Sequence, residues 1–352
     1  MPTLTAPALR RTAAATLVVL GLSAVGAGPS AAADTDVTWT VRTASNDLGD
    51  DRTGFEYTVD PGARVDDAMV VANHGTAPLD LAVYAADGYT TDSGQLDLLV
   101  GGEESHGVGT FVAAAVDHVT VPPGETVDVP FTVAVPDGAT PGDYAGGLVT
   151  SLVAPDDEAG INVDRRLGIR VDVHVGGELA PALAVEDVHV TYHGTVDPFG
   201  TGDATVTYTL HNTGNVALSA AQQASATGPF GWLAASAGTV AAPPQLLPGE
   251  TWTVTATVPD VRPAFRLTAT ATVSPLLTDA SGSTTSLTPV VVTAGTWAVP
   301  WTLLALLVLV AAAVVVGVRV VRGRRVQARQ REDARVHEAV EEALREREVP
   351  TR

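Results

Sequence analysis

Alternating apolar and polar residues mark several short segments in the middle of the chain. Every second residue is apolar across residues 127–135, and residues 252–258 alternate in the same way. A period of two puts the apolar side chains on one face of a strand, which is typical of an antiparallel sheet with one face on a core. Aromatic residues are few, whereas Val, Thr, Ala, Gly and Pro are abundant. The pattern therefore predicts an all-β exterior.

Turn signals separate these segments and occur twice in the same order. An Asn-x-Gly signal stands at residues 73–75 and again at 212–214, and a Pro-Gly-Glu-Thr signal stands at 123–126 and again at 248–251. Asn and Gly supply the positive φ that tight connections need. Two copies of one order predict two tandem immunoglobulin-like β-sandwiches.

The breaks between the repeats set the expected boundaries. We expect an outer β-sandwich over residues 34–178, with a polar loop over 156–164, and a membrane-proximal β-sandwich over residues 179–293. Glycine and proline residues between Gly176 and Pro181 read as the hinge between the two.

The N-terminus has the order of a secretory signal. Two arginines precede an apolar run over residues 13–25, and a stretch of alanines then ends at Ala33, ahead of Asp34. A basic start, a short apolar run and small residues at a cleavage point define a signal peptide. We expect residues 1–33 to be removed after Ala33.

A second apolar segment predicts a membrane anchor. Residues 298–318 contain no charge, and about 20 such residues cross a bilayer core of ~30 Å. Trp297 and Trp301 stand at its outer edge, as interfacial aromatics do, and four arginines follow within residues 319–325. We expect a single-pass protein of the cell membrane, with extracellular N-terminal domains and a charged cytoplasmic tail over residues 319–352.

Composition excludes several kinds of chemistry. The chain has no cysteine and no lysine, which excludes disulfides, a thiol nucleophile, a Cys-based zinc site, a Walker phosphate loop and Schiff-base catalysis. We expect no cofactor. Residues 34–318 contain 8 arginines against 33 acidic residues, a net charge of −25. Such an exterior repels nucleic acid and anionic membrane surfaces and favours solubility; association with divalent cations is the alternative reading.

Four stretches in the first half of the exterior are more specific than a generic sandwich. They are FEYTVDPG at 55–62 before NHG at 73–75, YTT at 89–91 before LDLL at 96–99, VPPGE at 121–125 before PGDYAGGL at 141–148, and RRLGIRV at 165–171 before GEL at 177–179. In these features residues 37–180 resemble the WxL-interacting protein family of Gram-positive cell surfaces. The resemblance implies a peptidoglycan-binding outer domain, followed in that family by a domain that contacts partner or host proteins. The membrane-proximal module matches less well, and we do not extend host binding to it.

The acidic stretch that follows Tyr84 is the candidate binding site. An exposed tyrosine can stack on a sugar face, and carboxylates and amides can bond hydroxyl and acetamido groups. The expected glycan-binding residues are Tyr89, Asp92, Gln95, Asp97, Glu103, Glu104 and His106. The alternative is a solvated hairpin insertion without a ligand.

Catalytic and metal sites are not predicted. His189 and His193 share a face of an expected strand but stand ~13 Å apart there, too far to chelate one metal. The aspartates around Gly49 lack the spacing of a calcium loop. Paired carboxylates raise a glycosidase as an alternative, but nothing in the sequence places two of them across a cleft.

Three functions are compatible with this sequence. The first is a non-enzymatic protein that binds the cell wall, as peptidoglycan, through its outer sandwich. The second is a protein-binding adhesin or scaffold that presents an edge strand or loops to another surface protein. The third is an accessory subunit of a membrane enzyme or transporter, which acts through the helix and the tail.

Overall fold

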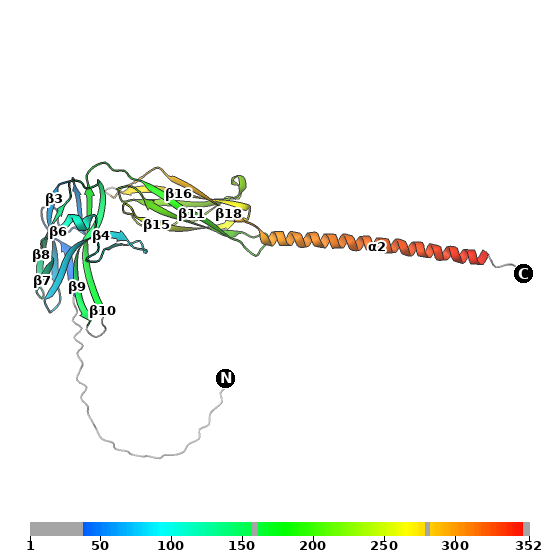
Figure 1. Cartoon of the computed structure of the whole chain (residues 1–352), viewed down its shortest axis with the longest axis horizontal. Helices are drawn as coiled ribbons and strands as arrows, with labels where there is room; N and C mark the ends of the chain where they lie inside the picture. The colour runs from blue at the N-terminus through cyan, green and yellow to red at the C-terminus, as the bar shows by residue number, and fades with distance from the viewer. Residues whose placement is uncertain (1–37, 157–160, 279–281, 348–352) are drawn as a thin grey trace, which may run out of the picture.

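The computed structural model describes residues 38–156, 161–278 and 282–347. It consists of two β-sandwiches in series, followed by one long helix (Figure 1). The all-β exterior, its two immunoglobulin-like sandwiches and the C-terminal apolar helix expected from the sequence are confirmed. The expected signal peptide, residues 1–33, lies outside the described residues.

The outer sandwich contains two sheets and one short helix. One sheet has the spatial order β1 (Trp39–Thr43), β3 (Arg64–Asn73), β8 (Thr126–Ala134) and β6 (Val112–Ala114). The other has the order β2 (Phe55–Val59), β10 (Ile161–Val175), β9 (Gly142–Asp156), β4 (Leu79–Thr90) and β5 (Leu96–Leu98), with β7 (His118–Val121) also paired to β4. The helix α1 (Val108–Phe111) precedes β6. All neighbours pair antiparallel except β2 and β10.

The core of the outer sandwich follows the period-two pattern. On β8, Val129, Phe131 and Val133 are buried, and the residues between them are more exposed. Phe131 meets Phe55 of the opposite sheet edge to face, with ring centroids 4.8 Å apart. Burial of each such side chain contributes roughly 1.5–3 kcal/mol, so this strand is held mainly by its inward face.

The membrane-proximal sandwich is built in the same way. One sheet has the order β11 (Leu183–His193), β12 (Gly202–Asn212) and β15 (Thr251–Val261). The other has the order β14 (Ala235–Ser236), β13 (Ser219–Thr227), β16 (Phe265–Thr278) and β17 (Thr284–Ser286), with β18 (Val290–Ala298) also paired to β16. A single 3₁₀ turn, η1 (Pro229–Gly231), lies between β13 and β14. All of these neighbouring strands pair antiparallel.

Asn73 and Asn212 explain why the turn signals repeat. The buried amide of Asn73 donates to the carbonyls of Ala77 and Val121, and its main-chain oxygen accepts from Gly124 of the Pro-Gly turn. In the second module the amide of Asn212 donates to the carbonyls of Val216 and Leu246, and its main-chain oxygen accepts from Gly249. The Asn-x-Gly and Pro-Gly signals are therefore two halves of one buried hydrogen-bonded corner.

The expected conformation of this corner was wrong in one respect. Gly75 and Gly214 do not adopt positive φ, whereas Gly124 and Gly249 in the Pro-Gly turns do, at 69° and 84°. The asparagine acts through its side chain, which satisfies carbonyl groups that the strands leave unpaired. Its side-chain oxygen also accepts from the amide of the glycine two residues later, at 2.8 Å in the first module and 3.1 Å in the second, so the side chain forms the turn as well.

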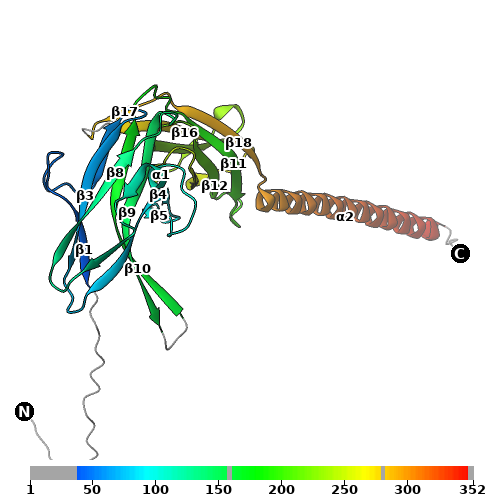
Figure 2. The ribbon, with the colours of Figure 1, turned by 60° about the vertical axis from the view of Figure 1, so that its left-hand side comes forward.

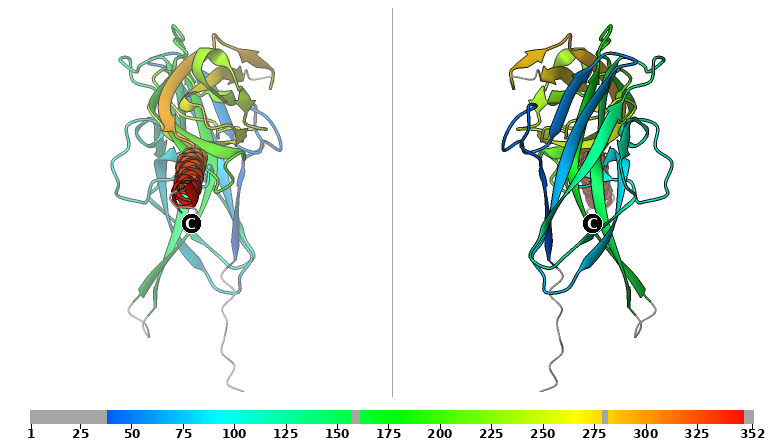
Figure 3. Two further views of the ribbon diagram at one scale, coloured as in Figure 1. Left: turned by 90° about the vertical axis from the view of Figure 1, so that its right-hand side faces the viewer. Right: turned by 90° about the vertical axis from the view of Figure 1, so that its left-hand side faces the viewer.

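The expected polar loop over residues 156–164 was wrong at both ends, where residue 156 and residues 161–164 are strand; residues 157–160 lie outside the described residues. β9 continues to Asp156, and β10 begins at Ile161, so the two strands form a hairpin that projects beyond the sandwich (Figures 2 and 3). The backbone bonds between β9 and β10 do not depend on side-chain polarity. A polar stretch can therefore remain paired where no core lies beneath it.

The C-terminal helix α2 (Trp301–Arg347) is continuous through the expected span and most of the expected tail. It begins three residues later than residue 298, because Ala298 is fully buried as the last residue of β18. The sandwich correspondingly runs five residues past 293. Two residues, Val299 and Pro300, connect strand and helix. By length and composition this helix could cross a membrane.

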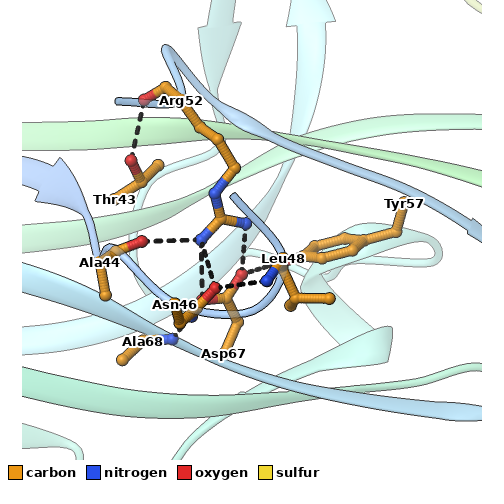
Figure 4. Close-up of polar contacts among 8 residues, drawn as sticks. All are labelled: Thr43, Ala44, Asn46, Leu48, Arg52, Tyr57, Asp67 and Ala68. Carbon is orange, nitrogen blue, oxygen red and sulfur yellow. Dashed lines mark hydrogen bonds and ion pairs between the residues drawn. The ribbon is translucent and has the colours of Figure 1, made fainter. Parts of the chain in front are cut away.

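A buried ion pair ties the loop after β1 to the outer sandwich (Figure 4). The carboxylate of Asp67, with no exposed side-chain surface, accepts from both terminal nitrogens of Arg52 at 2.6 and 3.0 Å. Tyr57 Oη and Asn46 Nδ2 donate to the same carboxylate at 2.6 Å each. Arg52 also donates to the Ala44 carbonyl and lies over the ring of Phe55. Every oxygen of the buried carboxylate is thus bonded, as a buried charge requires.

These bonds set the pKa of Asp67. Burial alone would raise it, but hydrogen bonds from Arg52, Tyr57, the Ala68 amide and Asn46 outweigh burial and lower it to about 2 from 3.8. Burial and the hydrogen bond to Asp67 raise the pKa of Tyr57. A depressed folded-state pKa contributes stability that is present above the unfolded pKa and lost as the pH falls through the folded one.

Asp67→Asn tests this cluster. At pH 7 the change should destabilise the outer sandwich by about 3 kcal/mol, because Arg52 keeps a buried charge without its partner. Between pH 4 and 2 the unfolding free energy of the unaltered chain should fall, whereas that of the variant should stay nearly level. Urea unfolding followed through buried Trp39, with the other four tryptophans changed to Phe, measures both. The exposed matched change Asp128→Asn should leave stability within about 0.5 kcal/mol; an equal effect there would contradict the assignment.

Candidate functional site at the junction of the two sandwiches

Asn215 joins the two sandwiches where they meet. Its side-chain amide donates to the carbonyls of Pro141 and Glu178 at 2.8 and 3.0 Å, and its side-chain oxygen accepts from the Ala180 amide at 2.7 Å. Pro141 precedes β9 of the outer sandwich, and residues 178 and 180 belong to the hinge. One side chain of the second module therefore fixes both the hinge and the outer module.

Asp143 makes the reciprocal contact from the outer module. Its main-chain amide donates to the Asn215 carbonyl at 2.8 Å, and its carboxylate accepts from the Ala217 amide at 2.8 Å and from His174 Nδ1 at 2.6 Å. The preceding Gly142 has φ of 140°, and a Cβ there would collide with the Asn215 carbonyl oxygen. The glycine of the PGDY stretch is thus required for the close approach of the two backbones.

Glu250 closes the junction on another side. Its carboxylate accepts from the main-chain amide and the hydroxyl of Thr90, each at 2.7 Å, and from the Leu247 amide at 2.8 Å. Thr90 ends β4 of the outer module. The equivalent residue of the first repeat, Glu125, is exposed. The second copy of the Pro-Gly-Glu turn therefore binds the other module. We call this contact between Glu250 and Thr90 the clamp.

A small apolar cluster lies inside this frame of polar contacts. Ala145 of the outer module packs with Ala217 and Leu247 of the second, and Leu96 of β5 covers them. The apolar contact is small, so the orientation of the two modules comes mainly from the directional hydrogen bonds around it.

Two hollows flank the junction. One, of about 360 Å³, is lined among others by Asp87, His106, Tyr144, Asn215 and Glu250. The other, of about 580 Å³, lies across β9 and is lined among others by Tyr144, Arg170, His174, Leu179 and Leu277. Both contain residues of the two sandwiches, so neither would exist in an isolated module.

The carboxylates of the smaller hollow are already bonded within the protein. Asp87 accepts from the main-chain amides of His106, Gly107 and Gly109, which holds the loop before α1. Asp143 and Glu250 accept from the groups described above. Each of the three therefore stabilises backbone, and the hollow offers a ligand its carbonyls, rings and the exposed His106.

The structure separates the expected glycan-binding residues into three places. Tyr89 and Asp97 lie opposite each other on the β4–β5 hairpin, with Tyr89 Oη 3.4 Å from Asp97 Oδ2. Asp92 and Gln95 lie in the exposed tip of that hairpin, where Thr91 bonds the Gln95 carbonyl. Glu103, Glu104 and His106 are exposed in the following loop, and His106 reaches the smaller hollow.

The hairpin side chains alternate in their surroundings. Thr90 meets Glu250 of the second module, so Tyr89, one residue earlier on the strand, belongs to the opposite face, and 41% of its surface is exposed. The hairpin is thus pinned on one face and open on the other.

Sequence reasoning missed the residues that build the junction: Thr90, Asp143, Asn215 and Glu250. Asn215 directly follows the Asn-x-Gly signal and Glu250 lies in the second Pro-Gly-Glu turn, so both stand within motifs that were recognised. A difference between the two copies marks Asn215 alone, which takes the place that Thr76 holds after the first signal; Glu250 has the same residue, Glu125, as its counterpart and carries no such signal.

Among residues 38–156, 161–278 and 282–347, no three His, Asp or Glu side chains gather as a metal site. His189 bonds the Asp187 carbonyl at a bulge in β11, and His211 pairs with Glu186 at 3.1 Å.

No protein-family model and no curated protein matches the chain. Among solved structures it is similar to a chaperone–tip adhesin complex of CFA/I fimbriae, at 8% identity over 73% of this chain and 98% of that one, with a TM-score of 0.35. It is also similar to the CsuC–CsuE chaperone–tip adhesion subunit pre-assembly complex of Acinetobacter baumannii, at 12% identity over 73% and 97%, with a TM-score of 0.31. A PapD-like domain of human CEP192 is 13% identical over 46% and 99%, with a TM-score of 0.25.

Asn215→Ala tests whether the junction is rigid. The change removes three hydrogen bonds, each worth about 1 kcal/mol, without touching either core. Because the chain has no cysteine, spin labels can be placed at Leu48→Cys and Val291→Cys, one exposed site per module. Pulsed EPR should give a narrow distance distribution that broadens in Asn215→Ala.

Gln223→Ala is the matched control, because it removes an exposed amide far from the junction. A distribution that stays narrow in Asn215→Ala, or that is equally broad in the unaltered chain, would contradict a junction held by this residue.

Proposed function

We propose that this chain is a membrane-anchored surface protein that binds the cell wall, as peptidoglycan, without catalysis. The binding surface is the open face of the β4–β5 hairpin together with the loop that carries His106. The observation that carries the proposal is the clamp between Thr90 and Glu250, because it holds an exposed tyrosine and its polar neighbours in one fixed arrangement. A surface that is ordered before binding loses little conformational entropy on binding.

The chemistry of this surface suits a glycan with acetamido groups. Tyr89 offers a ring face to a sugar, and Asp97 and Gln95 on the same hairpin offer acceptors and donors. The hollow beside His106 is large enough for a substituent such as a short peptide stem. The resemblance of residues 37–180 to WxL-interacting proteins supports the same ligand.

A non-catalytic role agrees with the use of the carboxylates. A glycosidase needs one carboxyl group to donate a proton and a second to act on the opposite side of the sugar. Asp87, Asp143 and Glu250 each accept hydrogen bonds from backbone groups that shape the fold. Protonating or freeing Asp143 or Glu250 would loosen the junction, and the same change at Asp87 would loosen the loop before α1.

The anchor supplies the location. α2 is apolar over its first turns and carries arginines from Arg319 onward, which by the positive-inside rule remain in the cytoplasm. The two sandwiches then lie outside the cell, with the outer module and its hairpin away from the bilayer. The expected signal peptide agrees with this topology.

Retention on insoluble peptidoglycan tests the proposal. The full chain in detergent micelles should co-sediment with purified wall, and Tyr89→Ala and Asp97→Asn should each weaken retention about 3- to 10-fold, the value of one stacking or hydrogen-bonding contact. Both the protein exterior and the wall are acidic, so added salt should maintain or improve binding by screening repulsion.

Leu48→Ala and Asp128→Asn are the matched controls, since both side chains are exposed on the outer module away from the hairpin. The proposal fails if the unaltered chain is not retained, with or without calcium, or if the controls weaken retention as much as the hairpin variants.

A second function is favoured by one observation on β10. This strand pairs with β9 along its whole length, but β2 pairs only with its last five residues, Val171–Val175. Among the described residues, no strand covers the other edge of residues 161–170. Three of the eight arginines in the acidic exterior lie on this strand: Arg165 is exposed, Arg166 bonds the Leu98 carbonyl, and Arg170 pairs with Asp172, so Arg165 is the cation that a partner would meet. We propose the open edge as the place where an extended, acidic segment of a partner protein could add as a strand.

Crosslinking in intact cells separates the two functions. A photo-reactive residue at Arg165 or Leu167, both exposed, should give a protein adduct that survives digestion of the wall. The same residue placed at exposed Asp128 of β8 should not. Adducts that vanish with the wall, or that form equally from Asp128, would rule out a strand partner at this edge.

A further inference from the structure

One end of the membrane-proximal sandwich gathers exposed apolar side chains. This end is formed by the connections β11–β12, β13–β14, β15–β16 and β18–α2, and it is the end from which the helix leaves (Figure 1). Tyr192, Val196, Pro263 and Trp301 line one hollow of about 280 Å³, which places three of these connections together. A Cβ on Gly228 would lie 3.0 Å from Ala264, which adds the fourth.

The large apolar residues of these connections face solvent. Phe230 is 93% exposed, Phe199 80% and Trp232 71%. We call the whole set the apical cluster, and its members are Val196, Phe199, Phe230, Trp232, Leu233, Phe265, Trp297 and Trp301. Exposed apolar side chains gathered at one end of a domain, two of them with ring centroids 6.2 Å apart at Phe230 and Trp232, are typical of an interaction surface, because water does not solvate them favourably.

The two sandwiches use phenylalanine in opposite ways. The three phenylalanines of the outer module, Phe55, Phe111 and Phe131, are buried in its core. The three of the second module, Phe199, Phe230 and Phe265, are all exposed, and all lie in the apical cluster. The two sandwiches have similar folds, yet phenylalanine lies in the core of the outer sandwich and on the surface at one end of the other.

Backbone conformation supports a role for these side chains. Phe230, Leu233 and Phe265 adopt φ of 61°, 56° and 63°. A left-handed conformation costs a non-glycine residue roughly 1–2 kcal/mol, and glycine or asparagine would adopt it at lower cost. Three bulky apolar residues held in this conformation at one end indicate that their outward presentation is used.

We propose that the apical cluster is embedded in the interfacial layer of the bilayer that α2 enters. This inference rests on the membrane anchoring stated above and adds a second, independent contact with the lipid. Only Val299 and Pro300 separate the sandwich from the helix, so insertion of the helix brings this end to the membrane surface. Trp and Phe are suited to that layer, where the ring meets acyl chains and the edge meets headgroups.

Charges of both signs lie near the apical cluster: Asp197 and Asp260 stand at this end, and two arginines there suit lipid phosphates. Arg266 lies over the ring of Trp297 at 5.3 Å, and Arg262 stands in the β15–β16 connection. Arginines beside interfacial aromatics can bond lipid phosphates while the rings remain in the apolar layer. The membrane-proximal sandwich would then contact the bilayer through several loops as well as through the helix. The orientation of the two joined sandwiches relative to the membrane would therefore be fixed.

Single-tryptophan forms of the full chain test the proposal. One form keeps Trp232, one keeps Trp301, and one carries Leu48→Trp in the outer module, with all other tryptophans changed to Phe. Each is reconstituted in vesicles of equal phosphatidylcholine and phosphatidylglycerol, with or without bromine high on the acyl chains. Trp232 and Trp301 should be quenched by the brominated lipid and shielded from aqueous iodide, whereas a tryptophan at position 48 should show the reverse.

Phe199→Asp in the Trp232 form should reduce its lipid quenching about twofold, because a charge is unfavourable in the interfacial layer. Leu48→Asp should leave that quenching unchanged, and thermal unfolding should be equal in both, since both sites are exposed.

The outcomes distinguish the proposals. If Trp301 is quenched by lipid but Trp232 only by iodide, the anchor stands and the apical cluster does not dock. If Trp232 is shielded from both quenchers, the cluster contacts protein, such as a second copy, and lipid docking is wrong. If Trp301 is not quenched by lipid, membrane anchoring itself fails, and the inference falls with it.

Discussion

The contact between Asn215 and Asp143 is the constraint on which the arrangement of the whole exterior depends. It joins two backbones through direct hydrogen bonds, at a point where Gly142 allows an approach that any side chain would prevent. Hydrogen bonds of this kind contribute about 1 kcal/mol each, but they are directional, so they determine orientation more than affinity. The small apolar cluster around Ala145 packs beside them and adds contact between the two modules. A junction made this way sets the hairpin of Thr90, both hollows and the exit direction of the helix with respect to one another.

The sequence was sufficient for the fold because the fold depends on local periodicity. Alternation at residues 127–135 identified a strand with one buried face, and the repeated Asn and Pro-Gly signals identified two related modules. The junction could not be found in this way. Glu125 and Glu250 occupy the same place in the same motif, yet only Glu250 meets another module. Periodicity tells which face of a strand is buried, but the partner of a polar side chain depends on tertiary packing.

Errors at the ends of elements have the same origin. Residues 156–164 are polar and read as a loop, but strand pairing between β9 and β10 satisfies the backbone without any core contact. Ala298 reads as part of an apolar helix, yet its small side chain fits the end of β18, and Pro300 separates the two elements. In both places a side-chain pattern was used to predict a backbone hydrogen-bond pattern. The candidate glycan residues were found on one hairpin and one loop, but the face to which each belongs follows only from the contact between Thr90 and Glu250.

The uneven use of aromatic residues connects the two ends of the membrane-proximal sandwich. Its core is lined by small residues such as Ala224, Ala226, Ala269 and Ala271, with Tyr208 as its largest fully buried side chain. Each buried methylene contributes about 0.8 kcal/mol, so an alanine-rich core contributes less than the Phe-containing core of the outer module. Such a module gains most from contacts outside its own core. The junction supplies them at one end, through Asn215 and Glu250. Its phenylalanines, which a thin core cannot hold, are available at the other end, where the chain enters α2. The alanine-rich core and the exposed phenylalanines therefore belong to one distribution, in which the large apolar side chains of this module lie on the surface proposed to dock on the bilayer.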